Sequence, residues 1–227
     1  MGGIEYELVQ QVIPHLEDMT AWSSRAQMVL ADTVVVMLKG AQEPEIERLA
    51  SALSLSGGNA TLLAGDLPST ADRAAFVNAT GGTFLELDEG VRPTGHPAIH
   101  LVPALLADTE ERSGDASVQH LLKSLVLGYE VVARLAAAVK FDQEVHPHGH
   151  IGSVGVAAAV TYLRTENPEK VAHSMSVAGS LPLRTNWRPH HNPNGDGICT
   201  EGFLVFVRLV LYDRGIARVV PKGIAPQ

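Results

Sequence analysis

Acidic and histidine side chains crowd one short segment, LELDEGVRPTGHPAIH (residues 85–100), which contains Glu86, Asp88, Glu89, Arg92, His96 and His100. Neighbouring carboxylates raise one another's pKa, and imidazole titrates near neutral pH. These residue types can therefore take and give protons at cellular pH. We interpret the segment as an acid/base site at the junction of two helices. The alternative interpretation is a solvated helix end followed by a loop.

A second segment, HPHGHIGSVG (residues 146–155), carries His146, His148 and His150. In an extended chain the three imidazoles would point to one side, as metal ligands do, but Pro147 and Gly149 favour a turn. Neither cysteine neighbours nor an HExxH pattern accompany them. We therefore expect no metal or other cofactor, and a loop that places one histidine in a pocket before a helix begins.

Cations gather in a third segment, RTNWRPHHNPNGDG (residues 184–197), with Arg184, Arg188, His190 and His191. Arginine is suited to hold a carboxylate through two parallel hydrogen bonds. In an otherwise acidic chain this concentration of cations favours a carboxylate-binding role, and an exposed loop is the alternative.

The elements that must position these segments are predicted to be helices. Apolar residues recur at three- and four-residue steps, and alternating strand patterns are almost absent. Thr20 is expected to cap the first long helix and Gly40 to end it in a left-handed conformation. A short extended piece is expected at residues 61–65. The predicted helices are 21–38, 44–53, 71–87, 96–107, 117–140, 152–164, 168–179 and 200–215. We predict an all-α, irregular helical bundle formed by residues 1–215, with a C-terminal tail at 216–227.

Composition excludes several classes of partner. The 227 residues are 45% hydrophobic and 19% charged, as in a folded globular protein. Seventeen basic against twenty-five acidic residues give a net charge of −8, which disfavours nucleic acid and anionic membranes. The longest apolar stretches are interrupted by Glu130, Arg134 and Arg208, so no membrane segment is expected. Cys199 is the only cysteine and the N-terminus lacks a signal pattern, so we expect a cytoplasmic protein.

Six motifs occur in the order of a known family. They are ADTVVVMLKG, AAFVNATGGTFLELDEG, TGHPAIHLVPALLA, LVLGYEVVARLAAAV, HPHGHIGSVGVAAAV and EGFLVFVRLVLYDRGI. In these motifs the chain resembles the helical N-terminal domain of the MmgE/PrpD family, which includes 2-methylcitrate dehydratase, cis-aconitate decarboxylase and iminodisuccinate epimerase. The resemblance implies a homodimer and a cofactor-independent reaction on a small carboxylate-bearing substrate. The implied chemistry is proton transfer beside a carboxylate, as in dehydration, decarboxylation or epimerisation.

The resemblance also implies roles for individual residues. The family's acidic motif falls on residues 86–89, and its two His-Pro histidines fall on His96 and His146. His96 and His146 would be the acid/base pair, with Glu86 orienting or tuning His96. The expected substrate-binding residues are Asp88, Arg92, His148, Arg188 and His191.

The chain departs from the family pattern at three points. The family's lysine is absent from RPHHNPNGDG, and either Arg188 or His191 would replace it. Gly90 stands where decarboxylase-type members have threonine. Family members are also longer, because a second, α/β lid domain closes over the helical one. Two alternatives to a self-sufficient enzyme follow: a non-catalytic scaffold with a degenerate pocket, and a subunit completed by a separate lid protein.

Overall fold

The computed structural model describes residues 3–92, 95–113, 116–140 and 147–180. Over these ranges the chain forms eight α-helices and one small hairpin, which confirms the predicted all-α class. The predicted helix at 200–215 and the tail at 216–227 lie outside the described residues. The helices are α1 (Ile4–Val12), α2 (Ser23–Gly40), α3 (Pro44–Leu53), α4 (Ala71–Phe84), α5 (Pro97–Glu111), α6 (Val118–Ala138), α7 (Pro147–Thr165) and α8 (Pro168–Gly179).

The shorter elements are two 3-10 turns and one antiparallel hairpin. The turns η1 (Ile13–Glu17) and η2 (Met19–Ala21) connect α1 to α2. Strand β1 (Ala60–Leu62) pairs with β2 (Leu67–Ser69). The extended piece expected at residues 61–65 therefore overlaps β1, whereas its partner strand was not predicted.

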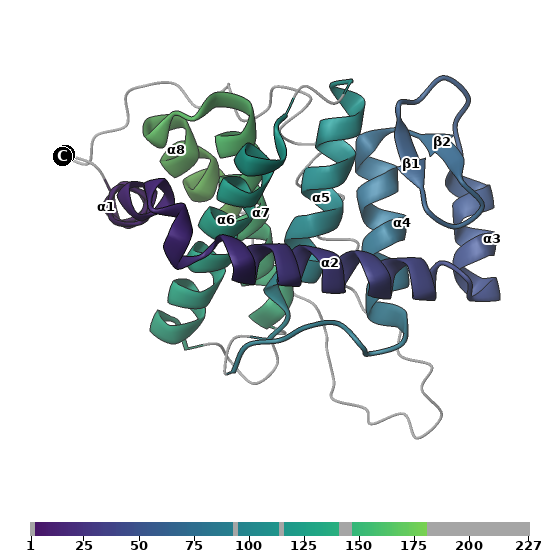
Figure 1. The fold of residues 1–227 in the computed structure, drawn as a ribbon, viewed down its shortest axis with the longest axis horizontal. Coiled ribbons are helices and arrows are strands. Elements are labelled where there is room, and N and C mark those ends of the chain that lie inside the picture. Colours follow the sequence, from purple (N-terminus) through teal and green to yellow (C-terminus); the bar gives the residue numbers. More distant parts are fainter. Residues whose placement is uncertain (1–2, 93–94, 114–115, 141–146, 181–227) are drawn as a thin grey trace.

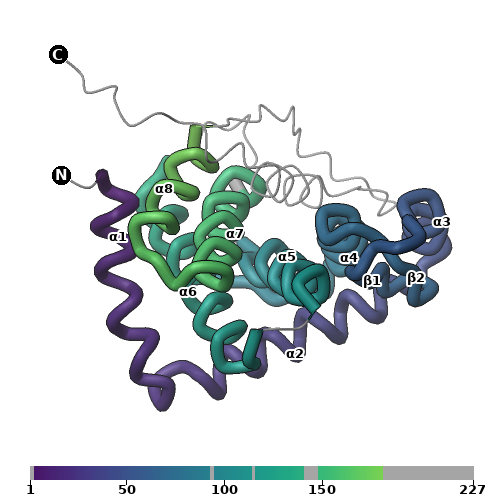
Figure 2. The backbone as a smooth tube through the Cα atoms, turned by 90° about the horizontal axis from the view of Figure 1, so that it is seen from above, coloured from purple at the N-terminus to yellow at the C-terminus, as the bar shows by residue number. Residues whose placement is uncertain are grey.

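Helices α4 to α7 lie side by side, and α2 runs across α4, α5 and α6 along the long axis of the molecule (Figure 1). The hairpin and α3 lie at one end, and α1 and α8 lie at the other, as the view from above also shows (Figure 2). The larger hydrophobic core packs α4, α5 and α7 around Ile99, Leu101 and Leu105. A second core around Leu127 and Met175 joins α1 to α6, α7 and α8. None of the helices in the described ranges combines the length and the hydrophobicity needed to cross a bilayer.

Proline marks three helix starts as the sequence predicts. Pro44, Pro97 and Pro168 each occupy the first turn, where the missing N–H has no intrahelical acceptor to lose. Before α8, the Asn167 side chain accepts a hydrogen bond from the backbone N–H of Lys170 at 2.9 Å. These starts are confirmed because their signals are local.

Several predicted boundaries were wrong, among them the end of α5, which lies at Glu111 and not at residue 107. Thr20 lies in η2, and α2 begins only at Ser23. Helix α4 ends at Phe84 because Glu86 adopts a φ of +54°, which a right-handed helix does not allow. Helix α7 begins at Pro147, so His148 and His150 lie in its first turn rather than in a loop. Proline at the first helical position is compatible with a helix, and here the helix takes precedence over a turn.

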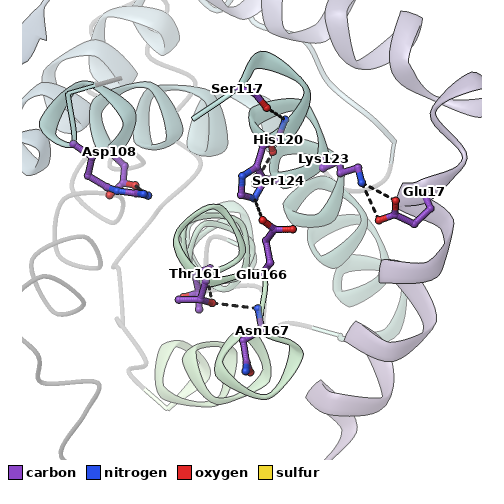
Figure 3. Close-up of polar contacts among 11 residues, drawn as sticks. Glu17, Asp108, Ser117, His120, Lys123, Ser124, Thr161, Glu166 and Asn167 are labelled. Carbon is purple, nitrogen blue, oxygen red and sulfur yellow. Dashed lines mark hydrogen bonds and ion pairs between the residues drawn. The ribbon is translucent and has the colours of Figure 1, made fainter. Parts of the chain in front are cut away.

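Polar contacts fix α6 and α7 against their neighbours (Figure 3). Lys123 Nζ on α6 lies 2.8 and 2.9 Å from the two carboxylate oxygens of Glu17 in η1. His120 Nε2 lies 3.8 Å from Glu166 Oε1, just beyond the end of α7. The fully buried carboxylate of Asp108 on α5 pairs with Arg164 on α7. Removing one partner of such a buried pair strands the other charge, so this contact holds the register of α5 against α7.

The crossing of α2 over α4 depends on glycine. A Cβ on Gly40 would lie 1.8 Å from the carbonyl oxygen of Gly81, a backbone atom that no side-chain rotation can move away. Gly40 is the last helical residue of α2 and its φ is not positive. The expectation of a left-handed stop was therefore wrong, because Gly40 serves a close backbone approach instead.

A Gly40→Ala substitution tests this reading. Overpacking against backbone typically costs 1–3 kcal/mol, so we expect the free energy of unfolding in urea to fall by about 2 kcal/mol. Gly179→Ala is the matched control, because a Cβ at the end of α8 meets nothing within 4 Å. That variant should be neutral or slightly more stable. Equal stability of the two variants would show that α2 can move away from α4 without cost.

Candidate functional site

The acidic segment forms a short, closed loop between α4 and α5. The backbone N–H of Val91 donates to the carbonyl of Gly95 at 2.8 Å, and the N–H of Gly95 donates back to Val91 at 2.9 Å. This pairing turns the chain back just before His96, which is the N-cap residue of α5. Residues 88–89 and residue 96 are thereby brought next to each other.

Glu89 is the hydrogen-bonding centre of this loop. Its Oε1 accepts the backbone N–H of Ala98 at 2.7 Å, in the first turn of α5. Its Oε2 accepts the hydroxyl of Tyr129 on α6 at 2.8 Å. A carboxylate at a helix N-terminus satisfies an orphan amide and interacts favourably with the helix dipole. Glu89 therefore joins the loop to both α5 and α6.

His96 is held through its Nδ1 atom. Nδ1 lies 2.8 Å from the carbonyl oxygen of Glu89 and 3.2 Å from Oδ2 of Asp88, whose side chain is only 4% exposed. A carbonyl and a carboxylate can only accept hydrogen bonds, so Nδ1 carries the proton in this arrangement. Nε2 is then the nitrogen that takes up or gives a proton, and the Asp88 carboxylate stabilises the imidazolium that results.

A second imidazole lies beside the first. The ring of His148, from the first turn of α7, has its centroid 5.6 Å from that of His96, with the planes tilted by 56°. Gly95 permits this approach: its φ is +101°, and a Cβ there would lie 2.3 Å from His148 Nε2. The histidine-bearing loop before α5 and the histidine-rich start of α7 therefore meet.

A similar contact lies one turn further along the same two helices. His100 on α5 is 2% exposed, and a Cβ on Gly152 of α7 would lie 2.7 Å from its ring. Here too the missing side chain lets an imidazole lie against the backbone of α7. The close packing of α5 on α7 is thus what brings the two segments to one place.

The surroundings of the site raise the pKa values of two of its side chains, Glu89 and Tyr129. Burial raises the pKa of the Glu89 carboxyl, while the hydrogen bonds from Ala98 and Tyr129 and the nearby His96 partly oppose this rise. The charge of Asp88 adds to it. Burial, together with the hydrogen bond to Glu89, raises the pKa of Tyr129 well above its usual range. Tyr129 consequently remains a hydroxyl donor at any physiological pH.

Comparison with known proteins assigns the chain to a family. The sequence profile of the MmgE/PrpD N-terminal domain matches residues 13–194. The chain belongs to this family. A curated relative, human cis-aconitate decarboxylase, is 30% identical over 113 residues. That alignment covers 47% of this chain and 24% of the human protein, so the chain spans only part of the length of this relative.

Within this MmgE/PrpD domain the structure brings together Asp88, His96 and His148. Glu86 and Arg92 are exposed, and the side chain of neither makes a hydrogen bond or ion pair with another described residue. Three further predicted site residues, His146, Arg188 and His191, lie outside the described ranges. Within those ranges, no group of three or more His, Cys, Asp or Glu is arranged to hold a metal ion.

Two residues of the site had no assigned role in the sequence interpretation. Glu89 was recognised as part of the acidic segment, but nothing in the sequence separates it from Glu86 and Asp88. Tyr129 lies forty residues along the chain from Glu89, within a helix whose pattern marks it as ordinary core. Only the packing of α6 against the loop reveals the pair.

The raised pKa of Glu89 predicts a pH dependence of stability in this MmgE/PrpD domain. The folded state binds the Glu89 proton more tightly than the unfolded state does. The stabilisation from that proton is complete below the ordinary glutamate pKa of about 4 and is lost as pH rises through the folded value. The free energy of unfolding of the wild type, relative to that of Glu89→Gln, should therefore decrease as the pH rises from about 4 through the pKa of Glu89 in the folded state.

Urea unfolding of both proteins over a pH series measures this difference. Tyr129→Phe removes a hydrogen bond that favours the charged carboxylate, so the decline should extend to higher pH in that background. If the difference in the free energy of unfolding between wild type and Glu89→Gln is the same at every pH, the raised pKa of Glu89 is contradicted.

Proposed function

We propose that this domain performs cofactor-independent acid/base chemistry on a small carboxylate-bearing substrate, as a lyase or isomerase. The observation that carries the proposal is the proximity of His96 to Asp88 on one side and to His148 on the other. Family membership and the human decarboxylase relative support a lyase-like reaction. Dehydration, decarboxylation and epimerisation share the step proposed here, removal or return of a proton beside a carboxylate.

In this proposal His96 Nε2 exchanges the proton with the substrate. Asp88 and the Glu89 carbonyl hold the ring and stabilise its charged form, as orienting groups do for catalytic histidines. The second acid/base group comes from the start of α7. His146, which directly precedes Pro147, is our candidate, and His148 would bind substrate.

Cations are needed for the substrate's carboxylates. We propose Arg92 at the exposed face of the loop, together with Arg188 or His191 from the third segment. Glu86 would tune the charge of the same loop. These assignments rest on the sequence pattern and the family resemblance.

The rival proposal is a subunit that does not catalyse alone, either a scaffold with a degenerate pocket or one half of an enzyme completed by a separate lid protein. The absence of the family's lysine from RPHHNPNGDG favours this reading. A small acid bound without chemical change would distinguish a scaffold. A stable complex with an α/β partner protein would distinguish the half-enzyme.

Proton exchange into deuterated water tests the catalytic proposal directly. The purified chain is incubated with cis-aconitate and citrate-like acids, and loss of the C–H signal next to a carboxylate is followed by proton NMR. Wild type should catalyse exchange, and His96→Gln should reduce the rate by about 10²–10⁴-fold while its circular dichroism is unchanged. His15→Gln, at an exposed histidine in η1, is the matched control and should exchange like wild type.

Unchanged exchange in a folded His96→Gln protein would remove His96 from the mechanism. Binding of the same acids by wild type with no exchange would favour the scaffold.

We also propose a homodimer. Three exposed apolar side chains share one face of α2: Met28, Val35 and Leu38 are 61%, 63% and 46% exposed. Burying such a stripe between two copies would be favourable. In sedimentation velocity, Val35→Asp should convert a dimer to a monomer, whereas Val118→Asp, at a 70% exposed apolar position on α6, should not. A dimer that survives Val35→Asp would place the subunit contact on another face.

A further inference from the structure

An open cavity of about 270 Å³ lies between α2 and α6, beside Val91 of the loop that precedes α5. Its walls are mainly apolar: Trp22, Ala26 and Val29 line one side, and Leu125 and Val126 line the other. No histidine lines it. The cavity is therefore a different place from the His96–His148 contact, and its chemistry has to be derived separately.

One uncompensated charge faces this cavity. Arg25 of α2 lines it and forms no ion pair with another residue of the described ranges. The acidic residue at the cavity, Glu130, is paired with Arg134 Nε at 3.0 Å, one helical turn along α6. Of the two charged residues that line the cavity, Arg25 is therefore the one without an ion-pair partner among the described residues, and it lies beside an apolar wall. A guanidinium in this setting suits a carboxylate, which it can hold through two hydrogen bonds.

Size and polarity limit the occupant further. A dry cavity of about 150 Å³ is enough for benzene, so this one has room for a ring or short chain together with a carboxylate. A second or third carboxylate would find no further unpaired cation in the lining and would have to face solvent or lie against apolar side chains, which is unfavourable. We propose that the cavity binds a small monocarboxylate with an apolar body, held by Arg25.

The cavity borders the acid/base site through Tyr129. The Tyr129 side chain lines the cavity, and its hydroxyl donates to Glu89 at 2.8 Å. An occupant would lie against the side chain that holds Glu89 in place. The binding itself, however, needs none of the histidines, so it does not depend on the proposed reaction.

Trp22 provides the signal for a direct test. The chain has two tryptophans, Trp22 and Trp187, so a Trp187→Phe background leaves Trp22, in the cavity wall, as the only indole fluorophore. Titration with phenylacetate should give a saturable change in Trp22 emission. The neutral analogue 2-phenylethanol should bind at least about tenfold more weakly, because it forfeits a charge-assisted contact.

Substitutions in the same background separate the contributions. Arg25→Gln, at an exposed residue, should weaken phenylacetate binding about tenfold or more and leave 2-phenylethanol unaffected. Arg48→Gln is the matched control, because Arg48 lies on α3 and is paired with Glu45 at 2.8 Å. Val126→Phe should fill the cavity and abolish binding of both compounds.

Binding of the acid and alcohol with equal affinity, unchanged phenylacetate affinity in Arg25→Gln, or no saturable signal would each overturn the proposal. His96→Gln in this background should bind phenylacetate as tightly as the parent. If this variant loses proton exchange but still binds phenylacetate, the cavity and the His96 site act independently. The failure of one proposal can then be told from the failure of the other.

Discussion

The candidate site depends on the hydrogen bonds made by one residue, Glu89. Its carboxylate accepts the N–H of Ala98 and the hydroxyl of Tyr129, and its carbonyl accepts from His96 Nδ1. A buried carboxylate is costly unless donors surround it, so the loop takes the one conformation in which both donors reach it. That same conformation points the carbonyl at the imidazole. The position of His96 is therefore set as much by α5 and α6 as by its own loop.

Glycine sets the second constraint. Gly95 and Gly152 leave room for the rings of His148 and His100, respectively, at distances where any Cβ would overlap them. A side chain at either position would separate α5 from α7 and pull the two histidine-bearing segments apart. The geometry of the site thus depends on the absence of two side chains as much as on the imidazoles present. Glycine permits this close approach at an entropic cost on folding, which close packing of the interface offsets.

How far the sequence predicts this structure depends on whether a signal is local. The starts of the helices at Pro44, Pro97 and Pro168 are predicted because proline acts within one turn. The role of Gly40 was misassigned because the residue that requires it, Gly81, lies on another helix. The same holds for the site. Clustering along the chain identifies Asp88 and His96, but the Glu89–Tyr129 hydrogen bond and the cavity cation Arg25 arise from helix packing, which no spacing rule encodes.

Exposure of His96 bears on how such a domain could catalyse. The Asp88 side chain beneath it is 4% exposed, whereas the His96 side chain is 35% exposed. In the proposed mechanism, the orienting side chain is therefore enclosed, whereas the side chain that would transfer the proton is open to solvent. Proton abstraction beside a carboxylate gains from excluding water, since electrostatic stabilisation strengthens as the local dielectric falls. The described helices thus supply orientation without full enclosure. In the half-enzyme alternative proposed above, a partner protein that covers His96 would provide this exclusion of water, and the helical domain would be the base on which it closes.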